Sequence, residues 1–358
     1  MIVAHLSDLH LGYRGLGRWD HGVNVRERDI ARAFQSAVER VIEARPALVV
    51  ITGDVFDRPD PSAQALVTLT RGIEALSTAL PETPVHLVAG ARDTPRRVGD
   101  SGALAALDAF PNVEAATSIP RTIHYEHLSL HVQLLPHRAV RAESQPLIEP
   151  DPRARFNVLA AYGQVRDDPG LANLEVDPQG WSYVALGSEH DMRAVAPRVS
   201  HAGALERVGP TPWREAGQDK GFLLVDLETG ERRFERIPGR AVVALAPTRA
   251  PRAAEAALRD RFAEVVREIP GGIAGKIVRV RLRGPRPGDL AALAGVLPDL
   301  SSAALHLSVE VEDQGGAPSA DMPLDLLEHA RACLDADAPA GAAQLLAEVL
   351  ADASGAEP

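Results

Sequence analysis

The chain has 358 residues with 45% hydrophobic content, and its formal net charge at pH 7 is −11. A chain of this length can bury a large core and is expected to form more than one domain. Its single cysteine, Cys333, excludes an internal disulfide, and its acidity argues against a generally basic surface of the kind that coats nucleic acid.

The first residues indicate neither a signal peptide nor a membrane anchor. Asp8 interrupts the first apolar run, and no apolar run approaches the roughly 20 residues that span a bilayer. We therefore expect a cytoplasmic protein with no membrane partner, in which any contact with DNA is confined to a local basic stripe.

Apolar strands alternate with helical segments through the first two thirds of the chain. Residues 28–45 and 62–80 carry apolar side chains at helical spacing, and each segment is followed by a proline. This alternation predicts stacked α/β layers. The runs typical of strands are residues 2–6, 48–52, 85–89, 128–135, 156–161, 183–186 and 221–226.

Pro238-Gly239 marks a boundary, after which a second α/β unit is expected. A linker with glycine and proline at residues 314–319 separates this unit from two amphipathic helices. These helices either dock on a partner's coiled coil or cap the chain's own core, and the sequence does not separate the two. The expected strands are residues 241–245, 276–282 and 304–311, and the expected helices are residues 254–269, 289–296, 324–334 and 340–351.

Polar residues follow five of these strands at the point where each strand ends. Asp8 and His10 leave the first strand two residues apart, which puts both side chains on the same side of an extended chain. Asp54 and His190 each follow a later strand after a glycine-containing turn. Because open α/β sheets place their sites at the carboxyl ends of the strands, one divalent metal ion could collect all four side chains.

Four motifs extend this pattern: SDLHLG at residues 7–12, GDVFDRPDPS at 53–62, GARD at 90–93 and GSEH at 187–190. Together they resemble the motif series of the calcineurin-like metallophosphoesterases. Within that superfamily the chain resembles the SbcD-type exonuclease subunit of DNA double-strand-break repair over roughly residues 1–226.

This resemblance implies a layered α/β sandwich of the calcineurin-like metallophosphoesterase type, with a smaller α/β capping domain and C-terminal helices. The division it implies is a metallophosphoesterase-like domain at residues 1–238, a capping domain at 239–313, and a linker with C-terminal helices at 314–358. As partners it implies DNA ends, an SbcC-like coiled-coil ATPase and a second copy of the chain in a homodimer.

Carried onto this sequence, the resemblance implies one complete metal site and one degenerate site. The other ligands of the second ion fall at Ala91, Tyr162 and Ser188, none of which is a good ligand for a hard divalent ion. We expect one divalent ion, manganese first with iron or zinc admitted by the same ligands, and no second ion. The residues that match the ligands of the first ion are Asp8, His10, Asp54, which also bridges to the second ion in the family, and His190.

The general-acid histidine of the family is matched by Arg92, which stays protonated and cannot cycle a proton at neutral pH. Arg92 is either a phosphate clamp or a space filler paired to Asp93, whose family role is to orient that histidine. Tyr162 is expected to pack rather than to bind metal, because a phenol has a pKa of about 10. The candidates for substitute ligands are Glu189, Asp191 and His201.

Loss of a general acid alone typically lowers a rate 10²–10⁴-fold. We therefore predict a nuclease-deficient subunit that binds DNA ends or the ATPase partner. The alternative is an active single-metal phosphodiesterase, dependent on manganese, that uses Arg92 as an electrophile on DNA or another phosphoester.

Overall fold

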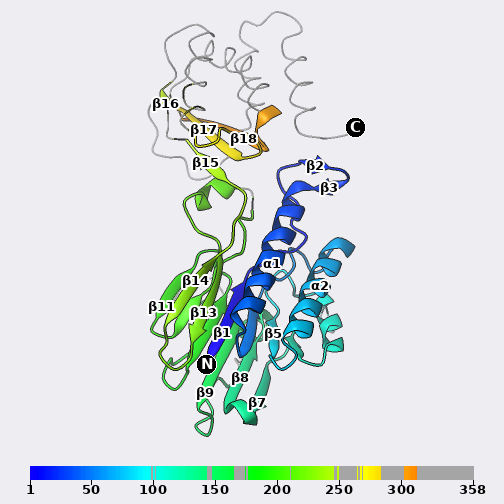
Figure 1. Cartoon of the computed structure of the whole chain (residues 1–358), viewed down its shortest axis with the longest axis vertical. Helices are drawn as coiled ribbons and strands as arrows, with labels where there is room; N and C mark the ends of the chain where they lie inside the picture. Colours follow the sequence, from blue (N-terminus) through cyan, green and yellow to red (C-terminus); the bar gives the residue numbers. More distant parts are fainter. Residues whose placement is uncertain are drawn as a thin grey trace, which may run out of the picture. The chain divides into compact units, whose positions relative to one another are not determined.

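The computed structural model describes residues 1–97, 100, 102–142, 147–164, 174, 176–209, 211–245, 248–249, 264, 267, 269–283 and 302–312 (Figure 1). The chain divides into two compact units. Unit 1 comprises Met1–Arg14, Val25–Val208 and Gln218–Gly239, and unit 2 comprises Gly15–Asn24, Gly209–Gly217 and Arg240–Pro358. Unit 1 ends at Gly239, but residues 15–24 and 209–217 of the predicted first domain belong to unit 2. The division at residue 238 stays a prediction, and the predicted boundary at residue 314 lies outside the described residues.

Unit 1 contains two six-stranded sheets, of which the first carries the strand order β14-β13-β1-β4-β5-β6 (Figure 1). Strands β1, β4, β5 and β6 are parallel, whereas β13 runs antiparallel to both β1 and β14. The strands are β1 (Ile2–Ser7), β4 (Leu48–Thr52), β5 (Val85–Val88), β6 (Val113–Ala116), β13 (Gly221–Asp226) and β14 (Arg232–Arg236).

The second sheet has the order β11-β12-β10-β9-β8-β7. Its four central strands are parallel, and antiparallel strands form its two edges. All seven strands predicted before residue 227 are confirmed, with shifts of one or two residues at their ends. The strands of this sheet are β7 (Arg121–Tyr125), β8 (Leu130–Leu135), β9 (Phe156–Tyr162), β10 (Tyr183–Gly187), β11 (Arg193–Ala196) and β12 (Val199–His201).

The two sheets pack face to face, and helices α1 (Val25–Ala44) and α2 (Ala63–Ala79) cover the outer face of the first sheet. Side chains of β1 and of β4 point to both faces of the first sheet. Val3 and Val50 lie in the core between the sheets, whereas Leu6 and Ile51 pack beneath the helices. The polar strand ends therefore do not come from one open sheet, as the sequence suggested. They come from β1, β4 and β5 in one sheet and from β9 and β10 in the other.

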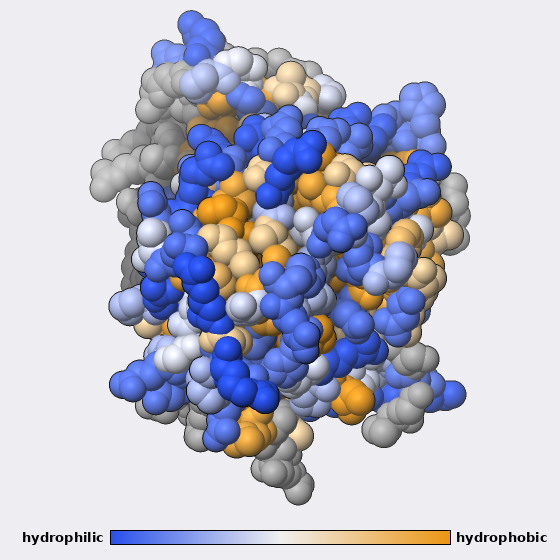
Figure 2. Space-filling view, turned by 60° about the horizontal axis from the view of Figure 1, so that its bottom comes forward, coloured by the Kyte–Doolittle hydropathy of each residue, from blue (hydrophilic) through white to orange (hydrophobic). Residues whose placement is uncertain are grey.

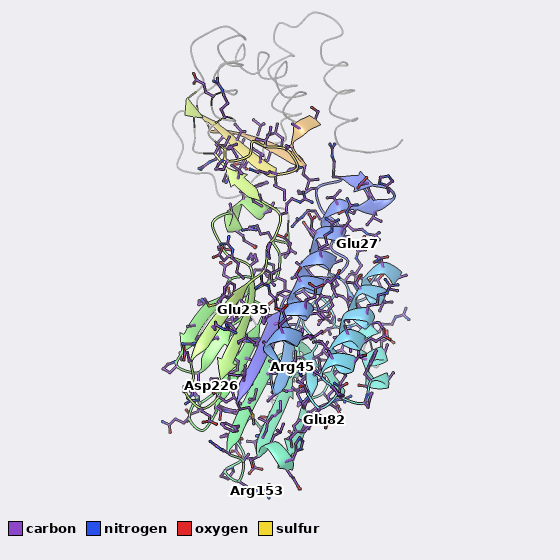
Figure 3. All side chains as sticks on the ribbon, in the orientation of Figure 1. Glu27, Arg45, Glu82, Arg153, Asp226 and Glu235 are labelled. Carbon is purple, nitrogen blue, oxygen red and sulfur yellow. The ribbon has the colours of Figure 1, made fainter. Side chains whose placement is uncertain are left out.

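Hydrogen bonds to the buried carboxylate of Glu27 hold the loop that follows β1. Glu27 near the start of α1 (Figure 3) accepts hydrogen bonds from Ser62 Oγ and from Arg14 Nε, both at 2.8 Å. Ser62 is also the N-cap of α2, because its hydroxyl accepts from the Ala65 amide at 3.2 Å. One carboxylate thus connects two helices to the loop. The short helices of the chain are α3 (His137–Val140), η1 (Ala103–Ala109), η2 (Glu126–Leu128) and η3 (Pro212–Glu215).

Unit 2 contains a parallel sheet in which β17 pairs with β15, β16 and β18. Its buried face carries Val278 and Val280, which pack with Ile269 and Ile273. The three strand predictions after residue 238 are confirmed, while the helices predicted at 289–296, 324–334 and 340–351 lie outside the described residues, as does most of 254–269. The strands of unit 2 are β2 (Trp19–Asp20), β3 (Val23–Asn24), β15 (Val242–Ala244), β16 (Thr248–Arg249), β17 (Ile277–Arg283) and β18 (His306–Glu312).

The surface of unit 1 mixes polar and apolar residues. In Figure 2 apolar residues gather near the middle of the visible face, and hydrophilic residues surround them. Among the described residues, no helix combines the length and the hydrophobicity that a membrane crossing requires. The large apolar side chains of unit 1 that are more than about one third exposed are Ile2, Val67, Ile119, Leu147 and Met192.

His86 in β5 makes the stability of unit 1 sensitive to acid. Its side chain is 0% exposed, with Nε2 3.2 Å from the Tyr125 hydroxyl, and burial lowers its pKa to about 3. A histidine with an ordinary pKa of about 6.5 in the unfolded chain then binds its proton only on unfolding. Its contribution to stability is complete above pH 6.5 and is lost as the pH falls from 6.5 towards 3.

We therefore expect His86→Leu to become less destabilising, relative to wild type, as the pH falls. Between pH 7.5 and pH 5 the difference in unfolding free energy should move by about 2 kcal/mol in favour of the variant. Urea unfolding of both proteins at the two pH values measures this change. A difference that stays constant with pH would show that His86 does not carry the effect.

Candidate metal centre

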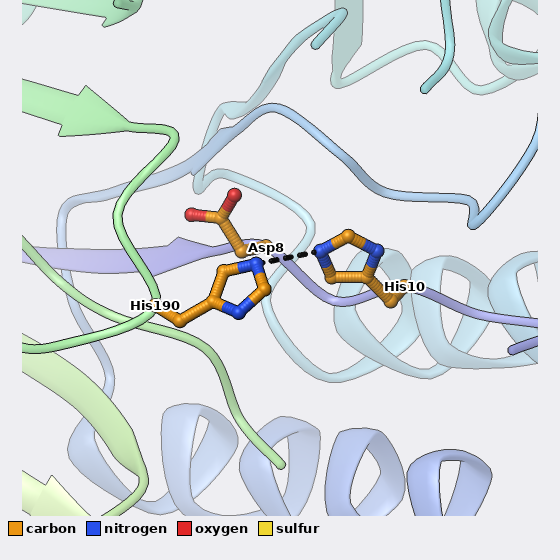
Figure 4. A group of neighbouring side chains, drawn as sticks. All are labelled: Asp8, His10 and His190. Atoms are coloured by element: carbon orange, nitrogen blue, oxygen red, sulfur yellow. Dashed lines mark hydrogen bonds between the residues drawn. The ribbon is translucent and has the colours of Figure 1, made fainter. Parts of the chain in front are cut away.

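Three of the predicted ligands gather at the edge where the two sheets meet. The side chains of Asp8, His10 and His190 offer ligand atoms that all lie within 4.8 Å of one another (Figure 4). Asp8 and His10 follow β1, and His190 follows β10 in the other sheet. They form the one group of three possible metal ligands within the part of the chain that the structure describes.

The backbone at this edge is held in an unusual conformation. Asp8 and His10 have φ angles of 48°, Asp54 has 43° and Ser188 has 85°, all in the left-handed region that non-glycine residues rarely adopt. Such strain persists only where the surrounding structure enforces it, and it is concentrated at functional sites.

The spacing of the donor atoms fits a shared divalent ion. His10 Nε2 and His190 Nε2 are 3.2 Å apart, and two nitrogen ligands about 2.0–2.1 Å from one tetrahedral zinc ion lie about 3.3 Å apart. Asp8 Oδ1 is buried and has no hydrogen-bond donor among the described residues. Its Oδ2 accepts from Ser7 Oγ and from the Ser188 amide. A buried carboxylate oxygen without a partner is costly, and a metal ion would satisfy it.

The raised pKa of Asp8 is also consistent with a bound metal ion at this position. Burial, together with the negative charge of Asp54, raises the pKa of Asp8 to about 8. A bound cation would favour the ionised carboxylate, so metal binding at neutral pH would release a proton and would strengthen as the pH rises.

The Asp57 carboxylate lies next to the ring nitrogen of His10 that faces away from His190. Its Oδ1 lies 3.4 Å from His10 Nδ1, which leaves Nε2 facing His190. A carboxylate behind a metal-binding histidine fixes the orientation and the tautomer of the ring. The motif GDVFDRPDPS contains Asp57, but the sequence reasoning gave it no role.

Replacing Asp57 with alanine should therefore weaken metal binding. We expect the affinity of Asp57→Ala for Zn²⁺ to fall about 10–100-fold, the usual effect of removing such a partner. Isothermal titration measures it. Asp60→Ala removes the same charge from an exposed position in the same loop and is the matched control. Equal affinities for the two variants would contradict the role of Asp57.

The fourth predicted ligand, Asp54, lies outside this group. Its Oδ1 accepts a hydrogen bond from the Arg92 amide at 2.7 Å, and its Oδ2 accepts from the Tyr162 hydroxyl at 2.9 Å. Both oxygens of the carboxylate that bridges two ions in the family are thus bound by donors of the protein itself.

The ring of Tyr162 packs tightly against two glycines beside Asp54. A Cβ atom on Gly53 would collide with Tyr162 Cδ2, and one on Gly90 would lie 2.8 Å from Cε2. Tyr162 is 7% exposed, and burial raises its pKa, so its phenol stays protonated and donates. The expectation that Tyr162 packs is consistent with this geometry, but the sequence did not predict its hydrogen bond to Asp54.

A protein-family model describes the first part of the chain. Residues 1–164 match the model of the calcineurin-like phosphoesterases. This part of the chain is similar to that family. The structure confirms the predicted α/β sandwich, in which polar residues follow the strand ends.

The chain is also similar to curated proteins of DNA repair. The DNA double-strand break repair protein Mre11 of Thermoplasma acidophilum is 26% identical over 249 residues, which cover 65% of this chain and 64% of the relative. The Mre11 protein of Methanocaldococcus jannaschii is 30% identical over 113 residues, 32% of this chain and 29% of the relative. That of Aeropyrum pernix is 28% identical over 229 residues, 60% of this chain and 52% of the relative. The chain spans less than two thirds of these relatives.

Solved structures include TT1561 of Thermus thermophilus, with a TM-score of 0.40 and 12% identity over 66% of this chain and 99% of that chain. The sequence matches show that the chain is similar to calcineurin-like phosphoesterases and to DNA double-strand break repair proteins.

Arg92 and Asp93 do not pair in the structure. The Arg92 side chain is exposed and forms no ion pair with any described residue. Asp93 is buried and accepts from three main-chain amides, those of Val55 at 3.0 Å, Phe56 at 2.8 Å and Gly90 at 2.9 Å. The interpretation of Arg92 as a space filler paired to Asp93 is therefore not supported, because Asp93 instead ties two loops together.

The remaining candidate positions do not add ligands. Ala91 has no donor atom in its side chain, and Ser188 uses its amide on Asp8. The proposed substitutes are engaged elsewhere or buried: Glu189 binds Gln164, Asp191 contacts Lys220, and His201 is 0% exposed within β12. None of them joins Asp8, His10 and His190 in the group of possible ligands found among the described residues.

His137 is a residue of this edge that the sequence reasoning missed. It follows β8, its amide donates to the Ala89 carbonyl at 2.9 Å, and its ring lies edge-on to Tyr162 at 5.4 Å. Burial lowers its pKa, and the charge of Asp54 opposes that shift. The signal was present in the sequence, because His137 comes directly after an apolar strand and a proline, as the other site residues follow their strands.

Proposed function

We propose that this chain is a nuclease-deficient DNA-repair protein of the phosphoesterase type with one metal ion, which acts by binding DNA ends or a coiled-coil ATPase rather than by cutting DNA. The observation that carries the proposal is the Asp54 carboxylate, held by the Tyr162 hydroxyl and the Arg92 amide. In a two-metal hydrolase this carboxylate joins the ions, which clamp the attacking and leaving oxygens of the phosphate.

Three changes act against hydrolysis together. Tyr162 fills the space beside Asp54, and neither Ala91 nor Ser188 offers a good side-chain ligand to a hard ion. Arg92 replaces the general acid, whose loss alone is worth about 3–5 kcal/mol of barrier, and loss of the second ion removes several kcal/mol more. We expect cleavage to fall by orders of magnitude.

The first metal site could still recognise phosphate. Asp8, His10 and His190 would hold the ion, and Mn²⁺, Fe²⁺ or Zn²⁺ suits a set of two imidazoles and one carboxylate. A bound divalent ion supplies positive charge that attracts phosphate oxygens. The exposed guanidinium of Arg92 offers a second contact of the kind that binds phosphate.

The relatives support the proposed partners. Their names place them in DNA double-strand break repair, and the SbcD-like motifs support an SbcC-like ATPase partner, DNA ends as ligand and a homodimer. A role on DNA also supports a cytoplasmic location. Residues 239–313 are proposed as the capping domain and residues 314–358 as the segment for the ATPase.

Binding and cleavage measured on one substrate test this proposal. Linear duplex DNA labelled at its end is titrated in fluorescence anisotropy with the metal-loaded protein, beside a closed circular competitor. The same DNA is then incubated with Mn²⁺ and analysed on a denaturing gel. We expect binding that the circle competes for poorly, without cleavage. Mn²⁺-dependent shortening of the strand would overturn the proposal.

The second candidate is a single-metal phosphodiesterase, and the unpartnered Asp8 Oδ1 beside two imidazoles favours it. It predicts Mn²⁺-dependent turnover of bis(p-nitrophenyl) phosphate that Asp8→Ala abolishes. Turnover that survives Asp8→Ala would exclude this site as its source.

A further inference from the structure

Lys220 is a buried cation that contacts the metal-ligand loop. It directly precedes β13, its side chain is 1% exposed, and its Nζ donates to the main-chain carbonyl of His190 at 2.7 Å. Nζ also lies 3.4 Å from Asp191 Oδ1 and 3.4 Å from Gln218 Oε1. The shortest of these three contacts is therefore made to the residue that offers a metal ligand.

The same carbonyl has a second donor. The Ala204 amide donates to His190 O at 3.0 Å, and Ala204 also forms a parallel bridge with Ser7, the neighbour of Asp8. Gly203 has a φ of 82°, and a Cβ atom there would lie 2.7 Å from the Met192 nitrogen and 3.1 Å from His190 O. The loop that contains Gly203 and Ala204 thus contacts both the main chain of His190 and the end of β1, which Asp8 follows.

A buried ammonium needs compensation. Removing such a group from water is costly unless it is paired and hydrogen-bonded. Asp191, whose side chain is 48% exposed, offers Lys220 a carboxylate at 3.4 Å, and the carbonyl of His190 accepts a shorter hydrogen bond from the ammonium at 2.7 Å. An apolar residue would fill the space without this cost but would leave the carbonyl with one donor fewer.

We infer that Lys220 is a positioning residue for the metal site: its ammonium fixes the His190 carbonyl and so keeps His190 Nε2 opposite His10 Nε2. This inference rests on the proposed metal site. Lys220 touches neither the proposed ion nor a phosphate, and it acts through the main chain of His190.

The test compares the full-length chain with Lys220→Met, which keeps the length of the side chain and removes the ammonium. Zn²⁺ affinity is measured by isothermal titration, and the visible absorption of bound Co²⁺ reports the geometry of the ligands. We expect Lys220→Met to bind Zn²⁺ about 10–100-fold more weakly, as for other residues that orient a ligand, with an altered Co²⁺ spectrum. Lys220→Arg, which keeps a charged donor, is expected to recover part of the affinity.

The matched control is Arg232→Met. It removes a cation that donates to the carbonyls of Ala196 at 3.2 Å and Val199 at 3.4 Å, in the same sheet region but not to His190. We expect wild-type Zn²⁺ affinity and an unchanged Co²⁺ spectrum for it. If Lys220→Met does not fold, Lys220→Gln serves in its place.

Two failures are distinguishable. Lys220→Met with lowered thermal stability but wild-type Zn²⁺ affinity and Co²⁺ spectrum would assign Lys220 a purely structural role and overturn the inference. Wild-type protein that binds neither Zn²⁺ nor Co²⁺ would overturn the metal site itself, on which the proposed function and this inference both rest.

Discussion

The combined variant Ala91→Asn, Arg92→His, Tyr162→His and Ser188→His is expected to bind a second ion and to cleave linear DNA at least about 10²–10⁴-fold faster than wild type. The lower bound comes from restoring a general acid alone, and the second ion adds several kcal/mol of charge stabilisation. Mn²⁺-dependent degradation of end-labelled duplex DNA measures the rate, and elemental analysis counts the ions.

Tyr162 is the decisive position of the four. Replacing Tyr162 removes the hydroxyl that donates to Asp54 Oδ2, so this carboxylate becomes free to bind an ion. It also removes the ring that packs against Gly53 and Gly90, which opens space beside the carboxylate. Tyr162→Phe, which removes the hydroxyl and keeps the ring, is the control and is expected to give no cleavage. It separates the space that the ring fills from the hydrogen bond that it makes.

Two results would contradict this expectation. A fourfold variant that still binds one ion would show that Tyr162 and its neighbours do not exclude the second. A variant with two ions and no cleavage would show that the change extends beyond these four positions, and His137, edge-on to Tyr162, is the first place to look.

Removal of one ligand from the first site is the other large effect. We expect His190→Ala to weaken Zn²⁺ binding at least about 60-fold. Zinc sites with four ligands have apparent binding free energies of about 10–16 kcal/mol, or about 2.5–4 kcal/mol for each ligand, and each 1.4 kcal/mol is a factor of ten. Isothermal titration measures the loss directly.

A thermal shift gives an independent measurement. Zn²⁺ at 100 times the dissociation constant stabilises the protein that binds it by about 2.7 kcal/mol, and His190→Ala should lose that gain. His21→Ala, whose histidine is 93% exposed in unit 2, is the matched control and should behave as wild type. Equal shifts for His190→Ala and wild type would show that the ion binds elsewhere.

Local pattern predicted the strands because each is a short apolar run that ends in a turn. It did not show that these strands form two sheets. The strand Leu48–Thr52 is buried on both faces, so apolar and polar residues do not alternate along it. Its sequence therefore does not tell which face packs against helices and which packs against another sheet. That information lies in pairings between residues far apart in the sequence.

The candidate site divides in the same way. Asp8, His10 and His190 could be found because each lies within three residues of a strand end. The engagement of Asp54 could not, since Tyr162 reaches it from 108 residues away. Lys220 was equally hidden: a lysine at the start of an apolar strand is typical of a solvated strand end, and only the fold places it beneath His190.

The number of divalent ions per chain in purified wild-type protein, measured by elemental analysis after saturation with Zn²⁺ or Mn²⁺ and removal of excess metal, tests the central claim most directly. We predict one ion per chain, and none in Asp8→Ala. Two ions per chain in wild type would contradict the claim, because they would require that Asp54 leaves Tyr162 and that ligands other than Asp8, His10 and His190 complete a second site.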